Sequence, residues 1–225
     1  MTNDQPQHPP VHTVFPLFVN LSGRLAVVVG GGEVGRRKAQ AVLAGGGRVR
    51  LVCLEPKPAG TAFAAIDWHA TPYSDSYLDD AFLVFAAATA EVNRQVVRDA
   101  RARGVLVNVA DDPVASDFLM PATLRRGPLT VAVSTGGTAP ALAREVRRLL
   151  DELFDDAFAS WLEALADLRP VILARVADHD QRRRLFRQLA DRAWWERFRH
   201  EDQEVVRRML HDEVLRLVGP ESPPL

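Results

Sequence analysis

The sequence predicts an α/β fold: a doubly wound parallel sheet, then a small α+β segment and a C-terminal helical domain. Short apolar, β-branched runs alternate with helical patterns through the first half of the chain, as in repeated strand–helix–strand units. A glycine-rich turn joins the first such strand to the first helix, and the last third of the chain has helical periodicity throughout. We expect a disordered tail (1–13), a nucleotide-binding domain (14–113), an α+β segment (114–150) and a helical domain (151–225).

Composition sets broad limits on function. The 225 residues are 47% apolar and 25% charged, as in soluble globular proteins. A net charge of −1 gives no global field towards nucleic acid or membrane. No apolar run reaches membrane-spanning length, and no signal-peptide pattern is present, so we expect a cytoplasmic protein without nucleic-acid or membrane partners. Cys53 is the sole cysteine, and no Cys/His cluster marks a metal site.

The glycine-rich turn predicts a dinucleotide site. The apolar run Leu25–Val29 leads directly into Gly30-x-Gly32-x-x-Gly35, and a helical pattern follows over 36–43. In a Rossmann-type domain the first glycine permits the tight turn, the second lets the backbone approach a pyrophosphate, and the third lets helix and strand pack closely. The N–H groups and dipole at the helix start hold the anion. The alternative is a glycine-rich turn that holds no ligand.

An acidic residue at the end of the next strand indicates which cofactor binds. The predicted strand Arg48–Cys53 is followed by Glu55, about 20 residues beyond the last glycine of the motif, where an acid binds the ribose hydroxyls. A carboxylate there repels the 2′-phosphate of NADP, so we expect a preference for NAD. Lys57 lies two residues further on and could soften that repulsion.

Further strands are predicted over 67–70, 82–86 and 105–109. Thr89 follows the second of these and can cap a helix over 91–103. Asp111 follows the third. Parallel sheets bind ligands beyond the carboxyl ends of their strands, and Gly30, Glu55, Thr89 and Asp111 all fall at such ends.

Asp111 is the candidate catalytic group. A bound dinucleotide makes hydride transfer the expected chemistry, so the protein must supply a proton acceptor or donor. Asp111 follows a strand whose end lies near the expected nicotinamide position. Asp111-Asp112-Pro113 is also ordinary turn chemistry, and that alternative stays open. The sequence contains no nucleophile elbow, no Ser/His/Asp arrangement and no Walker lysine.

The segment after Pro113 predicts a second, anionic ligand. A hairpin pair is expected over 118–124 and 129–134, around Arg125-Arg126-Gly127-Pro128. A second glycine-rich helix start follows, and a helix begins near Pro140. The candidate ligand-binding residues of this helix start are Ser134, Thr135, Gly136, Gly137 and Thr138. Between 121 and 150 the charges sum to +4: Arg125, Arg126, Arg144, Arg147 and Arg148, against Glu145. A capped helix with a solvated arginine face is the alternative.

Several segments in unbroken order over about 14–150 carry a family resemblance. They are Phe15-Pro16-Leu17-Phe18, Val28–Val34, Ala88-Thr89, Asn108–Pro113, Phe118–Ala122 and Val131–Pro140. They resemble the precorrin-2 dehydrogenase family of sirohaem biosynthesis, which includes sirohydrochlorin ferrochelatases and the N-terminal part of fused sirohaem synthases. The resemblance implies NAD-dependent oxidation of precorrin-2, a tetrapyrrole with eight carboxylate side chains, to sirohydrochlorin. It also implies an intertwined homodimer built through the middle segment.

The resemblance assigns roles to individual residues. Asp111 falls on the family's catalytic aspartate, and Glu33-Val34 and Leu54-Glu55 fall on its NAD-contacting positions. Gly35 stands where the family commonly has alanine, and Thr135 stands where many members have serine. We therefore expect Gly30, Gly32, Glu33, Val34, Gly35, Leu54, Glu55 and Thr89 to bind NAD. The expected substrate contacts are Ser134 to Thr138 with Arg125, Arg126 and Arg144.

Two questions stay open in the sequence. Some family members also insert iron into sirohydrochlorin, and no ligand cluster here decides that point; Asp111 would be the shared residue. The chain ends without the methyltransferase domain of the fused synthases, so we do not expect it to methylate uroporphyrinogen. The alternative function is a nucleotide-sensing Rossmann regulatory module without catalysis.

Overall fold

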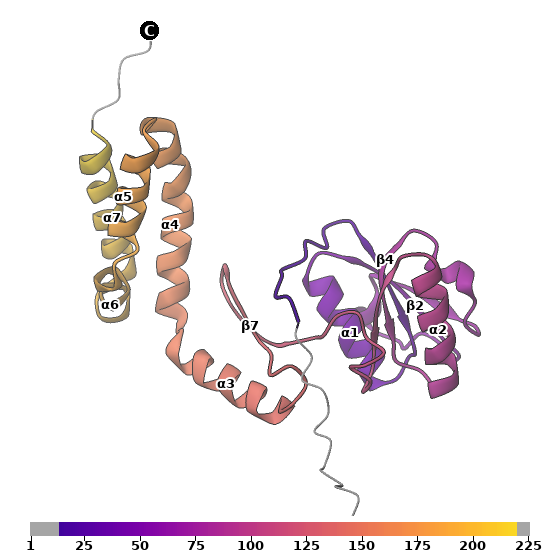
Figure 1. Ribbon diagram of the computed structural model, residues 1–225. Coiled ribbons are helices and arrows are strands. Elements are labelled where there is room, and N and C mark those ends of the chain that lie inside the picture. Colours follow the sequence, from indigo (N-terminus) through magenta and orange to yellow (C-terminus); the bar gives the residue numbers. More distant parts are fainter. Residues whose placement is uncertain (1–13, 220–225) are drawn as a thin grey trace, which may run out of the picture. The chain divides into compact units, whose positions relative to one another are not determined.

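The computed structural model describes residues 14–219, and the chain divides into two compact units between Met120 and Pro121 (Figure 1). The predicted tail, 1–13, lies outside the described residues. The division comes later than the expected boundary at 113. Residues 114–120 belong to the first unit because Asp117 and Phe118 bond to its last strand.

The first unit is a five-stranded parallel sheet with helices on both faces, as predicted. Its elements in chain order are β1 (Leu25–Val29), α1 (Glu33–Ala44), β2 (Arg48–Cys53), β3 (Ile66–Ala70), β4 (Ala81–Ala86), α2 (Ala90–Ala102) and β5 (Leu106–Val109). Short 3₁₀ turns at Thr61–Phe63 and Asp75–Leu78 flank β3. The strand order is β3-β2-β1-β4-β5, the order of a Rossmann-type sheet.

The strands read as continuous apolar runs because both faces of the sheet are buried. Val27 and Val29 face α2 and share a core cluster with its Val96. Ala26 and Val28 face α1 and share the other cluster with its Ala39. The two clusters hold the central strands rigidly between the helices. This places the carboxyl ends of β1, β2, β4 and β5 at one edge of the sheet, as expected for parallel strands.

The outer edge of β5 is covered by the chain that follows it. The Val107 N–H donates to Asp117 Oδ2 at 3.0 Å, and the Asp117 N–H donates to the Val107 carbonyl at 2.7 Å. The Val109 N–H donates to Ser116 Oγ at 2.8 Å. The prediction that a strand starts at Phe118 is wrong. Phe118 packs edge-on against Phe85, with ring centroids 5.5 Å apart, and so belongs to the core of the first unit.

The second unit begins with a two-stranded antiparallel hairpin, β6 (Ala122–Arg126) and β7 (Leu129–Val133). The sequence placed Arg125 and Arg126 in the turn, whereas they end β6 and only Gly127 and Pro128 connect the strands. Helix α3 (Pro140–Leu153) follows and contacts β6 and β7.

The predicted helical region forms four helices with one core. They are α4 (Asp156–Arg175), α5 (His179–Leu189), α6 (Arg192–His200) and α7 (Gln203–Val218). Their shared core includes Trp161, Phe198 and Leu210. Each of the four begins after an aspartate whose side chain accepts from a backbone N–H of the first turn. Within residues 14–219, no helix is long and apolar enough to cross a membrane.

Candidate active site

Close backbone packing requires the first and third glycines of the motif. Gly30 has a φ of 118°, and a Cβ there would lie 2.2 Å from the carbonyl oxygen of Ala87, just beyond β4. A Cβ on Gly35 would lie 2.0 Å from the carbonyl oxygen of Gly30. No side chain fits at either position without moving the backbone. The turn and the helix–strand packing therefore agree with the predicted roles of these two glycines.

Gly32, the second glycine of the motif, faces open space. A Cβ there would meet nothing within 4 Å, and its φ of −69° suits any residue. Gly32 is the N-cap of α1 and supplies no side-chain cap. The N–H groups of Glu33, Val34 and Gly35 have no acceptor within the described part of the chain. The fold itself does not demand a glycine at this position, which leaves room for an anion to approach the helix start.

Glu55 lies beside this loop, at the end of β2. Its Oε2 atom lies 3.1 Å from the position a Gly31 Cβ would take. The Glu55 carbonyl accepts from Trp68 Nε1 at 3.0 Å and from the Cys53 thiol at 3.3 Å. Burial raises the pKa of that thiol, so it is a protonated donor at neutral pH. These bonds fix the backbone at the end of β2, from which the Glu55 carboxylate extends beside Gly31.

The residues on either side of Glu55 have different surroundings. Leu54 is exposed at the end of β2. Lys57 donates to the carbonyl oxygens of Ile66, at 2.9 Å, and Ala64, at 3.4 Å. These bonds direct the Lys57 ammonium to the backbone before β3. The Glu55 charge is therefore not offset by an ion pair with Lys57.

At the end of β4, a buried amide that sequence reasoning missed fixes the loop of Thr89. The Thr89 hydroxyl caps α2 by accepting from the Val92 N–H at 3.4 Å. Asn93 is only 8% exposed. Its side chain accepts from the Ala88 N–H at 2.9 Å and donates to the Ala88 carbonyl at 3.3 Å. Its only sequence signal is a polar residue on the inward face of an otherwise amphipathic helix.

The two adjacent aspartates after β5 divide their roles. Asp112 Oδ1 accepts from the Ala115 N–H at 3.0 Å, and the Asp112 carbonyl accepts from Ser116 Oγ at 2.8 Å. Asp111 has a φ of 61°, in the left-handed region. Its carboxylate accepts no hydrogen bond from any residue in 14–219. The turn chemistry proposed for this sequence thus belongs to Asp112 and leaves the Asp111 carboxylate available.

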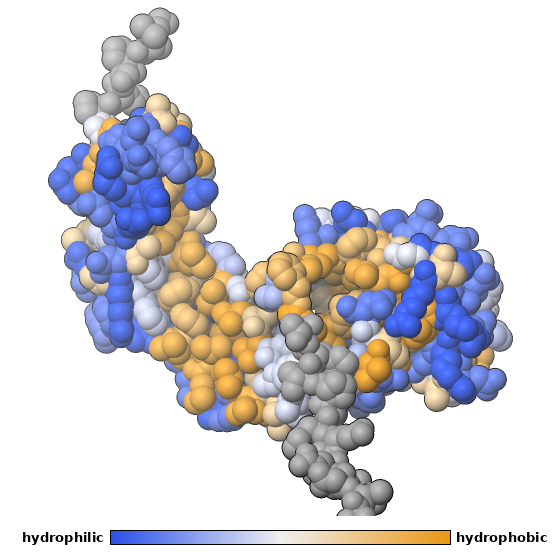
Figure 2. Space-filling view, in the orientation of Figure 1, coloured by the Kyte–Doolittle hydropathy of each residue, from blue (hydrophilic) through white to orange (hydrophobic). Residues whose placement is uncertain are grey.

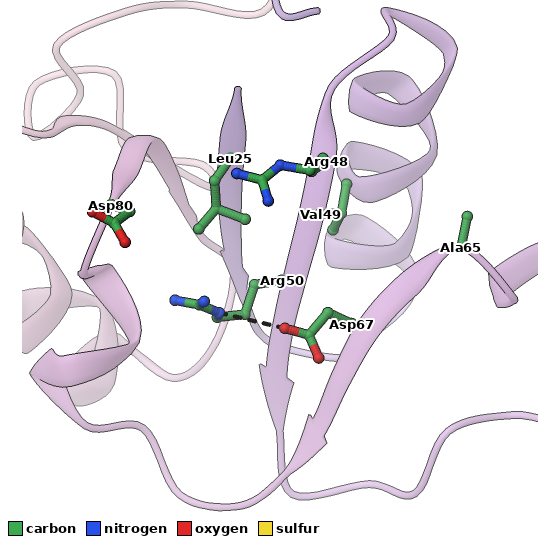
Figure 3. Close-up of a pocket in the computed structure, with 7 residues that line it drawn as sticks. All are labelled: Leu25, Arg48, Val49, Arg50, Ala65, Asp67 and Asp80. Carbon is green, nitrogen blue, oxygen red and sulfur yellow. Dashed lines mark ion pairs between the residues drawn. The ribbon is translucent and has the colours of Figure 1, made fainter. Parts of the chain in front are cut away.

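Two cavities in the first unit adjoin the ends of its strands. One, of about 460 Å³, lies beside the carboxyl end of β5 and is lined by Asn93, Val97, Val109 and Asp112, among others. The other, of about 250 Å³, lies among residues that begin β1 and β2 (Figure 3). There Arg50 pairs with Asp67 at 3.5 Å and donates to the Tyr77 carbonyl. The charged residues of this second cavity therefore stabilise the fold. The cavity lies away from the strand ends that carry the candidate residues.

The second glycine-rich helix start, in the second unit, is partly satisfied by its own side chains. Thr135 Oγ1 accepts from the Ala139 N–H at 3.2 Å, and Ser134 Oγ accepts from the Gly136 N–H at 3.2 Å. Gly136 and Gly137 have φ values of 62° and 82°, which explains why both are glycine. The hydroxyls therefore shape the loop before α3.

Most of the arginines in the predicted cationic cluster have acidic partners. Arg126 donates to Asp151 at 2.7 Å and to Asp156 at 2.9 Å. Arg148 pairs with Glu145 and Glu152. Arg125 and Arg144, two others of the five, are exposed. Within 14–219, Arg144 makes no ion pair. The +4 sum overstated the local charge because it stopped before the acidic residues that begin at 151.

Within the described residues, no group of three or more His, Cys, Asp and Glu side chains could hold a metal ion.

Two family models match separate parts of the chain. Residues 17–122 match a family model described as "Putative NAD(P)-binding", and residues 126–153 match one described as "Sirohaem biosynthesis protein central". The chain is 40% identical over 176 residues to a sirohaem synthase of Chromobacterium violaceum and 41% identical over 185 residues to sirohaem synthase 2 of Aeromonas hydrophila. These alignments cover 76% and 81% of this chain but 37% of each relative. The chain thus spans little more than a third of the relatives it matches.

A solved structure supports the fold over nearly the whole chain. "SirC, precorrin-2 dehydrogenase" superposes with a TM-score of 0.71, covering 90% of this chain and 100% of that chain, at 20% identity. The fold predicted from the sequence is therefore confirmed.

Proposed function

We propose a function from the premise that the chain belongs to the sirohaem biosynthesis family, whose NAD(P)-binding and central domains it carries. The proposed activity is NAD-dependent oxidation of precorrin-2 to sirohydrochlorin. The observation that carries the proposal is the strand-end arrangement. An open glycine loop with unpaired N–H groups and a carboxylate without a structural role both lie at the carboxyl edge of one sheet. The structural neighbour is itself named a precorrin-2 dehydrogenase.

The deciding experiment mixes the protein with NAD and enzymatically made precorrin-2 and follows the absorbance spectrum. We expect sirohydrochlorin and NADH to form in equal amounts. Both should form faster than in a control without enzyme. NAD binding without oxidation would instead favour a nucleotide-sensing module. If the protein neither binds NAD nor oxidises precorrin-2, the proposed cofactor site is overturned as well.

NAD binds, in this proposal, with its pyrophosphate at the start of α1 and its adenosine ribose at Glu55. The N–H groups of Glu33, Val34 and Gly35 supply donors for the phosphates. Glu55 accepts from the ribose hydroxyls, and Thr89 and Leu54 border the cofactor from β4 and β2. When bound, the cofactor accepts the hydride.

Asp111 accepts the proton that leaves with the hydride. Each oxidation removes one hydrogen from the substrate as a hydride, whose electron pair goes to the cofactor, and one further hydrogen as a proton. Asp111→Asn keeps the size of the side chain but cannot take that proton. We expect turnover to fall by about 10²- to 10⁴-fold with NAD affinity nearly unchanged.

The neighbouring residue provides a matched control. Asp112→Asn keeps an oxygen that can accept from the Ala115 N–H, so turnover should stay close to that of the wild type. Equal losses in the two variants would show that the loop, and not the Asp111 carboxylate, is what matters.

Substrate carboxylates bind, in this proposal, to the central segment. Arg125 and Arg144 are the leading candidates because both are exposed. Losing a charge-assisted hydrogen bond worth roughly 1.5–3 kcal/mol raises the substrate KM about 10- to 150-fold. We expect that increase in Arg144→Ala but not in Arg148→Ala, because Arg148 pairs with glutamates on its own helix. An unchanged KM in both Arg125→Ala and Arg144→Ala would move the substrate site elsewhere.

Two copies of the chain associate through the central segment. A two-stranded hairpin has little stability alone, and α3 leaves Leu142, Leu149 and Leu153 about half exposed on one face. Figure 2 shows apolar surface gathered over this part of the chain. The molar mass measured by light scattering should be that of a dimer. In Leu149→Glu the molar mass should fall to that of a monomer. A wild-type monomer at micromolar concentration would refute the association. We also propose a cytoplasmic location.

A further inference from the structure

Lys38 links helix α1 to the candidate catalytic strand. Its ammonium donates to Asn108 Oδ1 at 2.6 Å, and Asn108 Nδ2 donates to the Phe118 carbonyl at 2.8 Å. Asn108 lies in β5, three residues before Asp111, and is only 5% exposed. The ammonium also lies 5.0 Å from the centre of the Phe85 ring. This chain of contacts joins α1, β4, β5 and the segment that covers β5.

The composition makes a lysine at this position unusual. Lys38 and Lys57 are the only two lysines among the 28 Lys and Arg residues. Lys57 has a structural role, since it donates to two backbone carbonyls. Lys38 instead reaches a buried amide across the face of the sheet. A compact ammonium forms this single short bond where a planar guanidinium, with its five donors, would leave several unmet.

The charge of Lys38 is partly desolvated and has no close ion pair within the described residues. Burial lowers its pKa, Arg37 on the same helix lowers it further, and Asp111 raises it. The strands beneath contribute Phe85 and Asn108, which carry no charge. Asp111 is therefore the opposite charge that acts on Lys38. A partly buried cation without a close partner is costly, and a methionine would pack against Phe85 without that cost.

We propose that Lys38 is a positioning residue for the oxidation: its ammonium fixes the Asn108 amide and, through it, the end of β5 that carries Asp111. The proposal rests on the function proposed above. The bond to Asn108 Oδ1 leaves the amide N–H to hold Phe118, which fixes the end of β5 from which the Asp111 loop departs.

The test compares Lys38→Met with Arg37→Met. Arg37 precedes Lys38 on α1 and is exposed, and within the described residues its one ion pair is with Glu33, at 3.7 Å. Its loss is therefore a control for a nearby charge. For Lys38→Met we expect a Tm within a few degrees of the wild type and NAD affinity within about threefold. Turnover should fall by roughly 10- to 100-fold. The substrate KM should stay near that of the wild type, so that the loss falls on kcat, because the displaced group is the proton acceptor and not a substrate-binding residue.

The split between kcat and KM separates positioning from a merely structural role, which would lower the Tm and weaken NAD binding along with turnover. Lys38→Arg keeps a charged donor towards Asn108 Oδ1 and should recover part of the lost turnover. A wild-type kcat in Lys38→Met, or the same fall in Arg37→Met, would overturn the role of Lys38. A wild-type protein that does not oxidise precorrin-2 would overturn the proposed function itself, so the two failures are distinguishable.

Discussion

The sharpest test of the cofactor loop is a methyl group added at Gly32. The structure gives opposite expectations for two glycines of one motif. A Cβ on Gly30 would lie 2.2 Å from a backbone oxygen, whereas a Cβ on Gly32 would meet nothing within 4 Å. Gly32→Ala therefore fits the folded chain and occupies only the space through which an anion reaches the N-terminus of α1.

The expected magnitudes follow from this geometry. In Gly32→Ala the reduced freedom of the unfolded chain stabilises by about 0.4–1 kcal/mol, and the poorer N-cap costs a similar amount, so Tm should change by less than about 4 °C. NAD affinity should fall roughly 10- to 150-fold, the loss of one charge-assisted hydrogen bond worth about 1.5–3 kcal/mol. In Gly30→Ala, backbone strain and overpacking together cost about 2–6 kcal/mol, which lowers Tm by roughly 5–20 °C.

The measurements are thermal unfolding without ligand and NAD titration by calorimetry on the same samples. The essential result is that the two variants differ in what they lose. Gly32→Ala should keep its thermal stability but bind NAD weakly, whereas Gly30→Ala should lose thermal stability. If Gly32→Ala binds NAD as tightly as the wild type does, no phosphate approaches the loop at this glycine, and the pyrophosphate site must be abandoned. If it unfolds like Gly30→Ala, the open space that the structure shows beside Gly32 is wrong.

Three further predictions concern single carboxylates. Glu55→Ala should narrow the preference for NAD over NADP, measured as the ratio of the two dissociation constants; comparable constants in the wild type would remove Glu55 from this role. Asp117→Ala should lower the free energy of unfolding by about 1–3 kcal/mol, because it removes the acceptor of the Val107 N–H. An unchanged Tm would refute the role of Asp117 in covering the outer edge of β5. Burial alone would raise the pKa of Asp155, but hydrogen bonds from Trp195, Arg199 and the Phe158 N–H lower it. Stability from Asp155 is therefore full above the unfolded-state pKa of about 3.9 and is lost as pH falls through the lower folded pKa. Asp155→Asn should thus be less stable than the wild type at pH 7, and this difference should disappear as the pH falls below the folded-state pKa of Asp155.

Much of the fold was predictable because its signals are local. Strands β1 and β2 matched their expected bounds, since burial on both faces makes each strand a continuous apolar run. Helix α2 begins after Thr89 and ends near Gly104, whose φ is 67°. Among the described residues, the positions of Glu55, Thr89 and Asp111 followed from strand ends alone. A residue that directly follows a parallel strand lies at the carboxyl edge, whatever the rest of the chain does.

What the sequence could not give depends on contacts between distant residues. Phe118 has a strand-like pattern, yet the Phe85 ring and the Asn108 amide hold it in the core of the first unit. The hydrogen bond of Lys38 spans 70 positions, and no spacing rule links a helix residue to a strand residue at that separation. Arg126 was misjudged because its carboxylate partners lie 25 and 30 residues away, on α3 and at the start of α4.

The backbone at Asp111 favours the catalytic interpretation over the turn interpretation. A φ of 61° lets the chain reverse, so that Asp112 can bridge back to Val109 and cap the turn through its own side chain. Glycine would adopt this conformation without strain, whereas a non-glycine residue is less stable there by roughly 1–2 kcal/mol. Asp80, the other described non-glycine residue with positive φ, shows that aspartate tolerates the geometry but not that the geometry needs it. The turn therefore explains Asp112 and leaves the Asp111 carboxylate unexplained, unless its charge acts on a ligand at the strand end.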